Sequence, residues 1–392
     1  MRVVHLSLSD FRNYERAEVD LEPGQNLFVG FNGQGKTNLV ESLSYLSVLG
    51  SHRVSHDSAL IRQDTDFAVV RALLAYRGRE VMVEIQINRN SANRAQINRV
   101  VARPRDLPKY FSSVLFAPED LALVRGGPAN RRRFADDLLV LHRPRFSSVL
   151  ADYERVVRQR NTLLKSLRAA RRKEMSFDVL DVWDGRLVAL GSQIIDARVS
   201  LVDELGGPLA DAYFAIVGDD HGPGVRVHLS VDSDDPESLD DVISSSSEAE
   251  LAPCTDNPTE SRFAAALERI RPREIDRGVT LIGPHRDDFV FSLNGLPTKG
   301  YASHGESWSF VLALRLASAE LLRKSSSSGD PVLILDDVFA ELDEVRRSRL
   351  ATAIQDYEQV LVTAAVIDDV PLVSPSKVVQ IVGGTVDGGN HE

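Results

Sequence analysis

Cysteine is nearly absent from this chain: Cys254 is the only one among 392 residues. A single cysteine cannot form an intrachain disulfide, which indicates a reducing compartment. No run of about 18 apolar residues occurs that could cross a membrane. The first residues carry a strand-like pattern rather than the pattern of a signal peptide. From these absences we expect a cytoplasmic protein that is stabilised by an ordinary hydrophobic core.

Familiar nucleic-acid motifs are also missing. Aromatic residues make up only 6% of the chain, and we find no helix-turn-helix pattern, zinc-ligand spacing or aromatic stacking platform. Base-specific reading of DNA or RNA is therefore not expected. The formal net charge of −11 also argues against a nucleic-acid binder at first sight.

The charge is distributed very unevenly along the chain. Residues 232–260 hold ten acidic residues and no Lys or Arg, and without those ten charges the remainder carries a net charge of −1. This stretch is rich in Ser, Asp and Pro, so we expect a mobile surface insertion of unknown role. Residues 131–173 hold thirteen Lys or Arg against four Asp or Glu, a local excess of +9. The distribution of charge along the chain, rather than the net charge, indicates where a polyanion could bind.

Hydrophobic periodicity predicts an α/β fold built from both ends of the chain. Alternating or continuous apolar patterns predict strands at 3–8, 16–21, 26–30, 68–76, 80–87, 96–101, 113–117, 225–231, 279–282, 289–293, 332–335, 359–363 and 377–381. Helical spacing predicts helices at 37–48, through 130–217, and at 260–275, 307–324 and 344–356. Gly206, Gly207 and Pro208 are expected to kink or break the long helical run from 179 to 215.

We therefore predict a nucleotide-binding domain with an inserted, mainly helical lobe that contains an antiparallel helix hairpin. The expected boundaries are 1–128 for the N-terminal part of the nucleotide domain and 129–277 for the lobe, including the acidic stretch near 233–260. The C-terminal part of the nucleotide domain is expected at 278–392.

The segment "GFNGQGKT" from Gly30 to Thr37 fits the phosphate-loop pattern in full, between a predicted strand and a predicted helix. Glycines let the backbone wrap phosphates, Lys36 supplies a cation to the β- and γ-phosphates, and the Thr37 hydroxyl binds Mg²⁺. The alternative is a glycine-rich turn that happens to contain Lys. The expected nucleotide-binding residues here are Gly30, Phe31, Asn32, Gly33, Gln34, Gly35, Lys36, Thr37 and Asn38.

A second element of the same site is "PVLILDDVFAELD", from Pro331 to Asp343. Its apolar run predicts a buried parallel strand, with Asp336 at the carboxyl end where ligands bind in open α/β sheets. We expect Asp336 to hold Mg²⁺, and Asp337 to orient or polarise a hydrolytic water. The alternative is that the paired carboxylates only cap the following turn.

A third segment, "YASHGES", places Ser303, Gly305 and Glu306 at the start of a predicted helix. Open backbone N–H groups at a helix start attract anions, so Ser303 and Gly305 are candidates to contact the γ-phosphate of a second copy in a head-to-tail pair. The same residues fit an S-x-x-E capping box, which would make this an ordinary helix start.

Arginines in the predicted lobe form the best electrostatic footprint for DNA, because phosphate contacts give affinity that does not depend on base sequence. The candidates are Arg131, Arg132, Arg133, Arg158, Arg160, Arg168, Arg171, Arg172 and Lys173. The alternative is a solvated helical face with local ion pairs. His285, Asp287 and Asp288 also invite a nuclease metal site, but no second cluster with ligand spacing accompanies them.

The order of these parts resembles the ABC-type ATPases of the SMC-like class: phosphate loop, long insertion, Ser-x-Gly-Glu helix start, and hydrophobic strand with Asp-Asp. Further segments make the chain similar to the RecF family of bacterial DNA repair proteins over nearly its whole length. They are "LSLSDFRNYERAEVDLEPGQNLFVGFNGQGKTNLVESLSYL", "VLFAPEDLALVRGGPANRRRFAD", "LIGPHRDD", "YASHGES" and "LILDDVFAELD". The insertion at 233–260 does not fit the family pattern.

The resemblance implies an ATP- and Mg²⁺-dependent homodimer that binds junctions of double- and single-stranded DNA. It also implies action with RecR and RecO to load RecA recombinase onto gapped DNA coated with single-strand-binding protein. Arg12 and Asn13 match an element that lies near the nucleotide in this class. Asp343 falls at the position of the D-loop, which touches the opposite subunit.

Three departures limit what the resemblance implies. ABC ATPases usually carry Glu where this chain has Asp337, which predicts slow, DNA-dependent ATP turnover that drives release. Ala364 stands where the usual switch His follows the strand, and no Gln for the Q-loop is evident near Pro118 to Asp120. Two alternatives stay open: the nucleotide-binding subunit of a membrane transporter, and a DNA scaffold that does not hydrolyse ATP.

Overall fold

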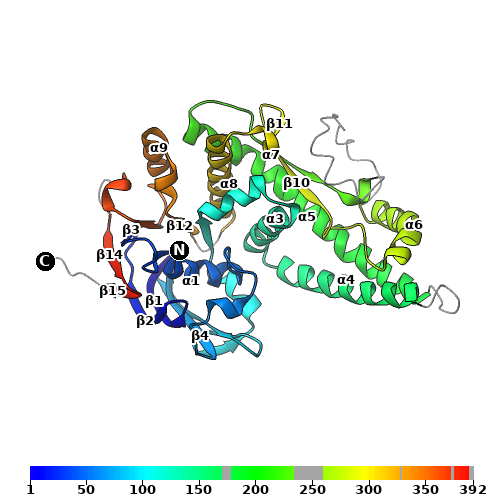
Figure 1. The fold of residues 1–392 in the computed structure, drawn as a ribbon, viewed down its shortest axis with the longest axis horizontal. Helices are drawn as coiled ribbons and strands as arrows, with labels where there is room; N and C mark the ends of the chain where they lie inside the picture. Colours follow the sequence, from blue (N-terminus) through cyan, green and yellow to red (C-terminus); the bar gives the residue numbers. More distant parts are fainter. Residues whose placement is uncertain (170–177, 234–258, 327–328, 372–374, 388–392) are drawn as a thin grey trace. The chain divides into compact units, whose positions relative to one another are not determined.

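The computed structural model describes residues 1–169, 178–233, 259–326, 329–371 and 375–387. These residues divide into two compact units, which are described separately. The sheet unit contains Met1–Ala122, Gly207–Asp220 and His304–Glu392, and the helical unit contains Leu123–Gly206 and His221–Ser303 (Figure 1). The predicted boundaries differ from this division, since residues 278–303 belong to the helical unit and 207–220 to the sheet unit. The expected acidic insertion falls almost entirely outside the described residues.

Two six-stranded sheets form the sheet unit. The first has the order β2-β1-β4-β5-β6-β7 and is antiparallel. Its strands are β1 (Arg2–Phe11), β2 (Tyr14–Asp20), β4 (Phe67–Tyr76), β5 (Arg79–Asn88), β6 (Arg94–Ile97) and β7 (Val100–Ala102). The single strand predicted at 96–101 is wrong. Asn98 and Arg99, both with positive φ, make a tight turn between two short strands there.

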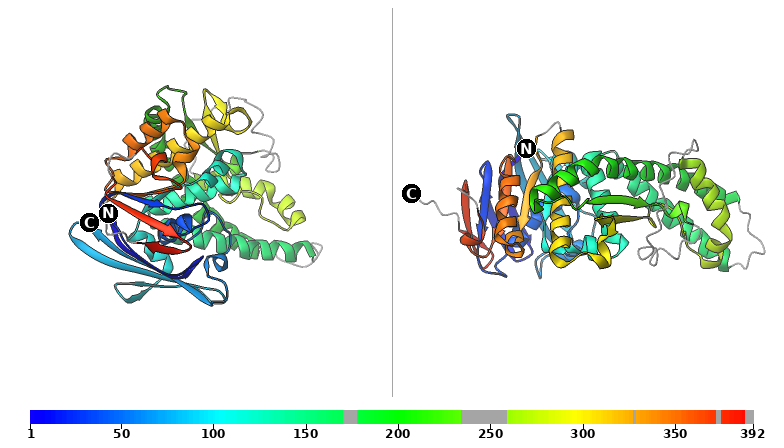
Figure 2. Two further views of the ribbon diagram at one scale, coloured as in Figure 1. Left: turned by 60° about the vertical axis from the view of Figure 1, so that its left-hand side comes forward. Right: turned by 90° about the horizontal axis from the view of Figure 1, so that it is seen from above.

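The second sheet has the order β15-β14-β3-β13-β12-β8 and is parallel except for its last hairpin. Its strands are β3 (Gly24–Val29), β8 (Ser113–Phe116), β12 (Val332–Asp336), β13 (Gln359–Ala364), β14 (Lys377–Val382) and β15 (Thr385–Asp387). In Figure 2 the red C-terminal strands lie beside the blue N-terminal strands. Both chain ends therefore build this sheet, as the sequence predicted.

Helix α1 (Lys36–Val48) joins the two sheets through one hydrophobic core. Its Leu39, Val40, Leu43 and Leu46 are fully buried among apolar side chains of both sheets. Burying one such side chain contributes about 1.5–3 kcal/mol relative to leaving it in water. This packing holds the first turn of α1 against the carboxyl ends of the parallel strands.

The other long helices of the sheet unit lie close to the predicted helices at 307–324 and 344–356. α8 (His304–Ser325) and α9 (Glu344–Ile354) flank β12, and short helical segments η1 (Asp57–Leu60), η2 (Pro104–Lys109), η3 (Pro118–Asp120), α2 (Leu121–Arg125), η7 (Val338–Glu341) and η8 (Ile367–Asp369) fill the connections. α2 begins in the sheet unit and continues into the helical unit.

The helical unit is built on long helices: α3 (Pro128–His142), α4 (Phe146–Ala169), α5 (Asp178–Val217) and α6 (Thr259–Arg277). Leu164 of α4 packs with Leu180, while Tyr153, earlier in α4, shares a cluster with Leu187 and Ile194 of α5. The two helices are therefore antiparallel, as expected for a helix hairpin. Gly206, Gly207 and Pro208 were expected to kink or break this helix. A break is wrong, because α5 runs through these residues to Val217 with Pro208 inside it.

A small sheet of order β11-β10-β9 completes the helical unit, with β9 (Gly224–His228), β10 (Asp288–Leu293) and β11 (Leu296–Pro297), together with α7 (Thr298–Tyr301) and η4 (Ser230–Asp232). β9 ends before the predicted 231, where η4 takes over. The strand predicted at 279–282 is absent. Side chains satisfy its backbone instead: Thr280 donates its N–H to Asn161 at 2.7 Å, and Leu281 donates to Glu274 at 2.7 Å.

Arg160 organises the polar centre of this unit. Its side chain has no exposed surface, and its guanidinium binds Asp184 and Glu274, each at 2.6 Å, and Thr280 at 2.9 Å. The three partners come from α5, from α6 and from the segment after α6. Removing one partner of a buried ion pair is costly because the remaining charge stays buried and uncompensated.

We expect Arg160→Met to destabilise the helical unit by about 3–5 kcal/mol, since it leaves Glu274 buried without its cation. Arg158→Met is the matched control, because Arg158 is exposed on the same helix and only contacts Glu154 at 3.5 Å. That control should change stability by less than about 0.5 kcal/mol. Urea unfolding of the full chain, followed by circular dichroism, measures both. Equal stability of the two variants would contradict the structural role of Arg160.

Candidate functional site

The phosphate-loop segment connects β3 to α1 at the carboxyl edge of the parallel sheet. Gly33 and Gly35 have φ values of 82° and 115°, a region that side chains other than glycine rarely adopt. A Cβ at Gly35 would lie 2.7 Å from the Asn13 side chain and 2.9 Å from the Tyr14 hydroxyl. Glycine is therefore required at position 35 for both conformation and space.

Lys36 is almost fully buried at the start of α1, with 3% of its surface exposed. Its ammonium donates to the carbonyl of Gly30 at 2.9 Å and to the side chain of Asn32 at 3.4 Å. The loop carbonyls thus hold a positive charge inside the curve of the loop. A cation at this place suits the β- and γ-phosphates of a nucleotide.

Asp336 stands at the end of β12 with only 2% of its surface exposed. Its Oδ1 accepts hydrogen bonds from the Thr37 hydroxyl at 3.1 Å and from the Thr363 hydroxyl at 2.7 Å. Burial raises the pKa of Asp336 to about 6, although both hydroxyls lower it. A carboxylate and a hydroxyl oxygen this close are the hard donors that Mg²⁺ prefers. Thr37 and Asp336 therefore fit the cation that the sequence predicts for them.

Asp337 begins the turn into η7 in a left-handed conformation, with φ 51° and ψ 22°. Its backbone N–H donates to the Thr363 hydroxyl at 2.9 Å. Burial raises the pKa of its carboxyl, and the nearby Lys36 opposes that rise. Asp337 also lines a pocket of about 270 Å³ together with Asn32, Pro118 and Thr363. The carboxylate thus borders a space next to the phosphate loop.

Arg12 and Asn13 form the turn between β1 and β2 and contact α1 and the phosphate loop. Arg12 binds Glu41 through two hydrogen bonds of 2.9 and 2.8 Å, and Glu41 has no exposed surface. Burial raises the pKa of Glu41, but the bonds from Arg12 and Ser51 bring it below the ordinary value. The guanidinium of Arg12 therefore anchors α1, whereas Asn13 contacts the loop itself by donating to the Gln34 carbonyl at 3.2 Å.

Asn38 links the loop to further polar residues that the sequence did not single out. It donates to Asn13 at 2.8 Å and accepts from Arg53 at 2.9 Å, and Arg53 lies 3.7 Å from Glu119. The Gln34 side chain of the loop accepts a hydrogen bond from the Gly383 N–H. No local pattern marks Arg53 or Gly383, since only the fold brings them to the loop.

The predicted second helix start lies at the N-terminus of α8. Ser303 is exposed and directly precedes the helix, while Gly305 and Glu306 lie in its first turn. A Cβ at Gly305 would lie 3.1 Å from the guanidinium of Arg346. Asp343 caps α9 by accepting from the Arg346 N–H at 2.9 Å. The structure therefore brings Gly305 next to the predicted D-loop segment.

The expected DNA-binding arginines separate into two classes. Arg131 and Arg160 are buried, 3% and 0% exposed, and Arg131 binds Asp288 through two bonds of 2.8 Å. The prediction that these two contact DNA is wrong, because their charges are neutralised inside the protein. Arg132 is half-buried and donates to the Asp287 carbonyl at 2.7 Å.

Three candidates keep exposed side chains: Arg133, Arg158 and Arg168. Arg133 and Arg158 each have a carboxylate partner one helical turn away, Asp137 at 3.7 Å and Glu154 at 3.5 Å. Arg168 donates to the carbonyl of Arg277 at 3.2 Å. The remaining candidates, Arg171, Arg172 and Lys173, lie outside the described residues. Among the predicted arginines in the described part of the lobe, three side chains are therefore exposed to solvent and Arg132 is partly so.

The His285 side chain is held by hydrogen bonds inside the protein. The ring accepts a hydrogen bond from the Tyr153 hydroxyl at 2.8 Å and donates to the Thr280 carbonyl at 3.3 Å. Burial lowers the pKa of His285 to about 3, so the ring is neutral. Across the described residues, no cluster of three or more His, Cys, Asp or Glu side chains is arranged to hold a metal ion.

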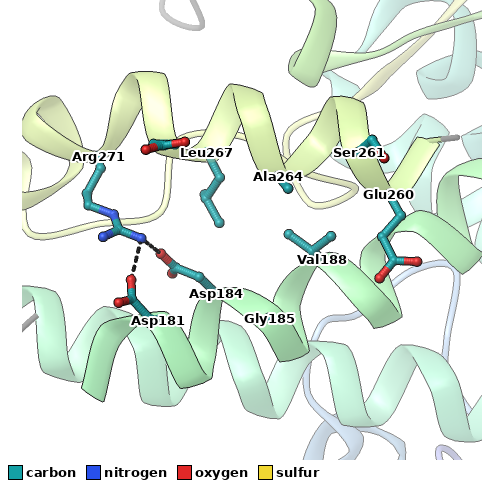
Figure 3. A pocket seen from close by; sticks show the side chains of 10 residues that line it. Asp181, Asp184, Gly185, Val188, Glu260, Ser261, Ala264, Leu267 and Arg271 are labelled. Atoms are coloured by element: carbon teal, nitrogen blue, oxygen red, sulfur yellow. Dashed lines mark hydrogen bonds and ion pairs between the residues drawn. The ribbon is translucent and has the colours of Figure 1, made fainter. Parts of the chain in front are cut away.

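A separate pocket of about 500 Å³ lies between α5 and α6. Figure 3 shows Leu267 of α6 and Val188 of α5 in the space between the two helices, with Arg271 directed toward Asp181 and Asp184. Glu260 and Glu268 also line it. The excess of carboxylates makes this pocket unsuitable for phosphate groups. In the described part of the chain, no helix is long and apolar enough to cross a membrane.

Comparison with known proteins places these features in a family. The family model described as RecF/RecN/SMC N terminal domain matches residues 2–377. The chain is 61% identical over 387 residues to the DNA replication and repair protein RecF of Clavibacter michiganensis subsp. michiganensis, covering 98% of this chain and 96% of that protein. It is 58% identical to RecF of Leifsonia xyli subsp. xyli over 386 residues, covering 98% and 99%.

Solved structures agree with the sequence comparisons. A structure of the recombination mediator protein RecF with ATP, in the RecFOR pathway, superposes with a TM-score of 0.85 at 25% identity, covering 98% of this chain and 96% of that one. A Smc head bound to the C-winged helix domain of ScpA shares the fold alone, with a TM-score of 0.51 at 14% identity and coverage of 99% and 96%. The predicted ABC-type ATPase head fold is confirmed. The chain belongs to the RecF/RecN/SMC family and, within it, to the RecF DNA replication and repair proteins.

Proposed function

We propose that this protein is an ATP-dependent DNA-binding protein of recombinational repair. Its phosphate loop and Asp336 bind ATP with Mg²⁺, and two copies associate around the nucleotide. The dimer binds gapped or junction DNA and, with RecR and RecO, helps load RecA. The observation that carries the proposal is the convergence of Lys36, Thr37 and Asp336 at one sheet edge, from segments 299 residues apart. The solved relative described with ATP supports the choice of nucleotide.

Hydrolysis in this proposal depends on Asp337, which borders the pocket beside the phosphate loop. Its side chain is one methylene shorter than that of the usual Glu, so it reaches less far toward the attacking water, which favours slow turnover. A slow step suits a protein that must remain on DNA until its partners have acted, and hydrolysis then drives release. Mg²⁺ would neutralise charge on the β- and γ-phosphates, and Thr37 and Asp336 would hold it.

Exposed apolar side chains near the phosphate loop support association of two copies. Phe31 is 81% exposed within the loop itself, and Val366 and Ile367 are 54% and 46% exposed just after β13, the strand next to β3. Val345, two residues after Asp343, is 60% exposed. Large exposed apolar residues gathered at one edge favour a protein partner. ATP between two copies would add its binding free energy to this contact.

We expect Lys36→Arg to bind ATP within a few-fold of the unchanged protein and to lose at least about 10-fold in turnover. The longer guanidinium cannot occupy the place that the Gly30 carbonyl gives the ammonium, so it stabilises the transferring phosphoryl group poorly. Lys109→Arg, at an exposed lysine, is the control. Calorimetry measures binding and phosphate release measures turnover. Unchanged turnover in Lys36→Arg would contradict the assigned site.

We expect Ser303→Arg to weaken ATP-dependent association at least about 10-fold while leaving ATP binding by each copy intact. The long arginine side chain would fill the space proposed for the partner's γ-phosphate and would keep the two copies apart. Light scattering with ATP·Mg²⁺, with ADP and without nucleotide reports the association. Ser261→Arg, at an exposed serine of the helical unit, is the control. Full association of Ser303→Arg with ATP would overturn the proposed arrangement.

We expect a combined Arg133→Glu, Arg158→Glu and Arg168→Glu variant to bind gapped duplex DNA more weakly and with a smaller salt dependence. Each lost phosphate contact lowers the slope of log K against log salt by about 0.9. Arg105→Glu, at an exposed arginine of the sheet unit, should leave the slope unchanged. Fluorescence anisotropy over a salt series with ATP provides the measurement. An unaltered slope in the triple variant would place the DNA elsewhere.

A further inference from the structure

Thr363 is hydrogen-bonded to both aspartates of the site. It lies near the end of β13, directly opposite Asp336 in the parallel pairing with β12. Only 1% of its surface is exposed. It directly precedes Ala364, which stands at the position where ABC ATPases usually have a His. Ala364 and Ala365 line the pocket beside the phosphate loop.

The hydrogen bonds of Thr363 have fixed directions. The backbone N–H of Asp337 can only donate, so the Thr363 oxygen accepts that bond at 2.9 Å. The hydroxyl proton is then directed to Oδ1 of Asp336 at 2.7 Å. One hydroxyl therefore links the carboxylate of the first aspartate to the main chain of the second.

Each of the two bonds has a separate consequence. The bond to Asp336 holds the carboxylate in one orientation beside Thr37, whose hydroxyl meets the same oxygen at 3.1 Å. The bond from Asp337 supports a left-handed backbone, which residues with a side chain rarely adopt. Without this bond, the turn that places the Asp337 carboxylate beside the pocket loses its anchor on β13.

We propose that Thr363 is a positioning residue for nucleotide hydrolysis, orienting Asp336 toward the divalent cation and fixing the backbone of Asp337. This inference rests on the proposed function. It assigns to a hydroxyl on β13 a share of the ordering that a switch His provides in related ATPases. The methyl group of Thr363 serves packing, whereas the hydroxyl serves the site.

Thr363→Val tests this directly, because valine keeps the shape and strand preference of threonine and removes only the hydroxyl. We expect it to bind ATP in EDTA as the unchanged protein does. With ATP present, its apparent affinity for Mg²⁺ should fall about 10-fold or more, the effect of losing a hydrogen bond to a charged group. The kcat should also fall at least about 10-fold, with KM for ATP changed by less than about 3-fold.

Thr363→Ser restores the hydroxyl without the methyl group and should recover both quantities to within about 3-fold of the unchanged protein. Thr298→Val is the matched control: Thr298 is also buried and makes a long bond of 3.4 Å to the Phe291 carbonyl in the helical unit. It should leave Mg²⁺ affinity and kcat unchanged. Thr363→Ala replaces the valine variant if circular dichroism shows that the latter is unfolded.

The outcomes separate this inference from the proposed function. Failure of the unchanged protein to bind ATP would remove the proposed function itself. Wild-type Mg²⁺ affinity and kcat in Thr363→Val, with ATP bound normally, would overturn the role of Thr363 alone. A serine variant as impaired as the valine variant would assign the effect to packing of the methyl group and would equally overturn the inference.

Discussion

Parallel pairing of β3, β13 and β12 is the constraint on which the site depends. Each strand delivers one part at its carboxyl end: the phosphate loop, Thr363 and Asp336. Because parallel strands end at the same edge, the register of two adjacent pairings fixes the distances between these parts. The hydrophobic core around α1 then holds Thr37 within 3.1 Å of Asp336. A slip of either pairing would separate the hydroxyls from the carboxylate.

Polar contacts around the loop extend this order beyond the strands. Asn13 and Asn38 tie the loop to the turn after β1, and Gln34 ties it to the turn between β14 and β15. Glu41, buried in α1, is neutralised by Arg12. This ion pair keeps the helix next to the turn after β1. The loop therefore has its shape before any phosphate arrives, which reduces the cost of ordering it on binding.

Charge serves two different purposes in the helical unit. Arg131, Arg160 and Arg198 are buried and bind carboxylates, so they specify how the helices and the small sheet pack. Exposed arginines such as Arg133 and Arg158 keep their charge at the surface, where phosphates can reach it. Counting basic residues along the sequence cannot separate the two groups, because burial depends on which residues the other helices bring opposite each arginine.

The sequence alone determined the site's chemistry and most of the elements. A phosphate-loop motif places its glycines and lysine, here Lys36, within eight consecutive residues. The buried strand that ends in Asp336 has a continuous apolar pattern. Both can therefore be recognised from a short stretch of sequence. Tertiary structure decided what depends on distant partners. The strand expected at 279–282 gave way to side-chain bonds from Asn161 and Glu274, and Arg160 became a buried anchor. Thr363 acquired its place only through strand pairing, because a hydroxyl on a strand has no local signal for the carboxylate it will face.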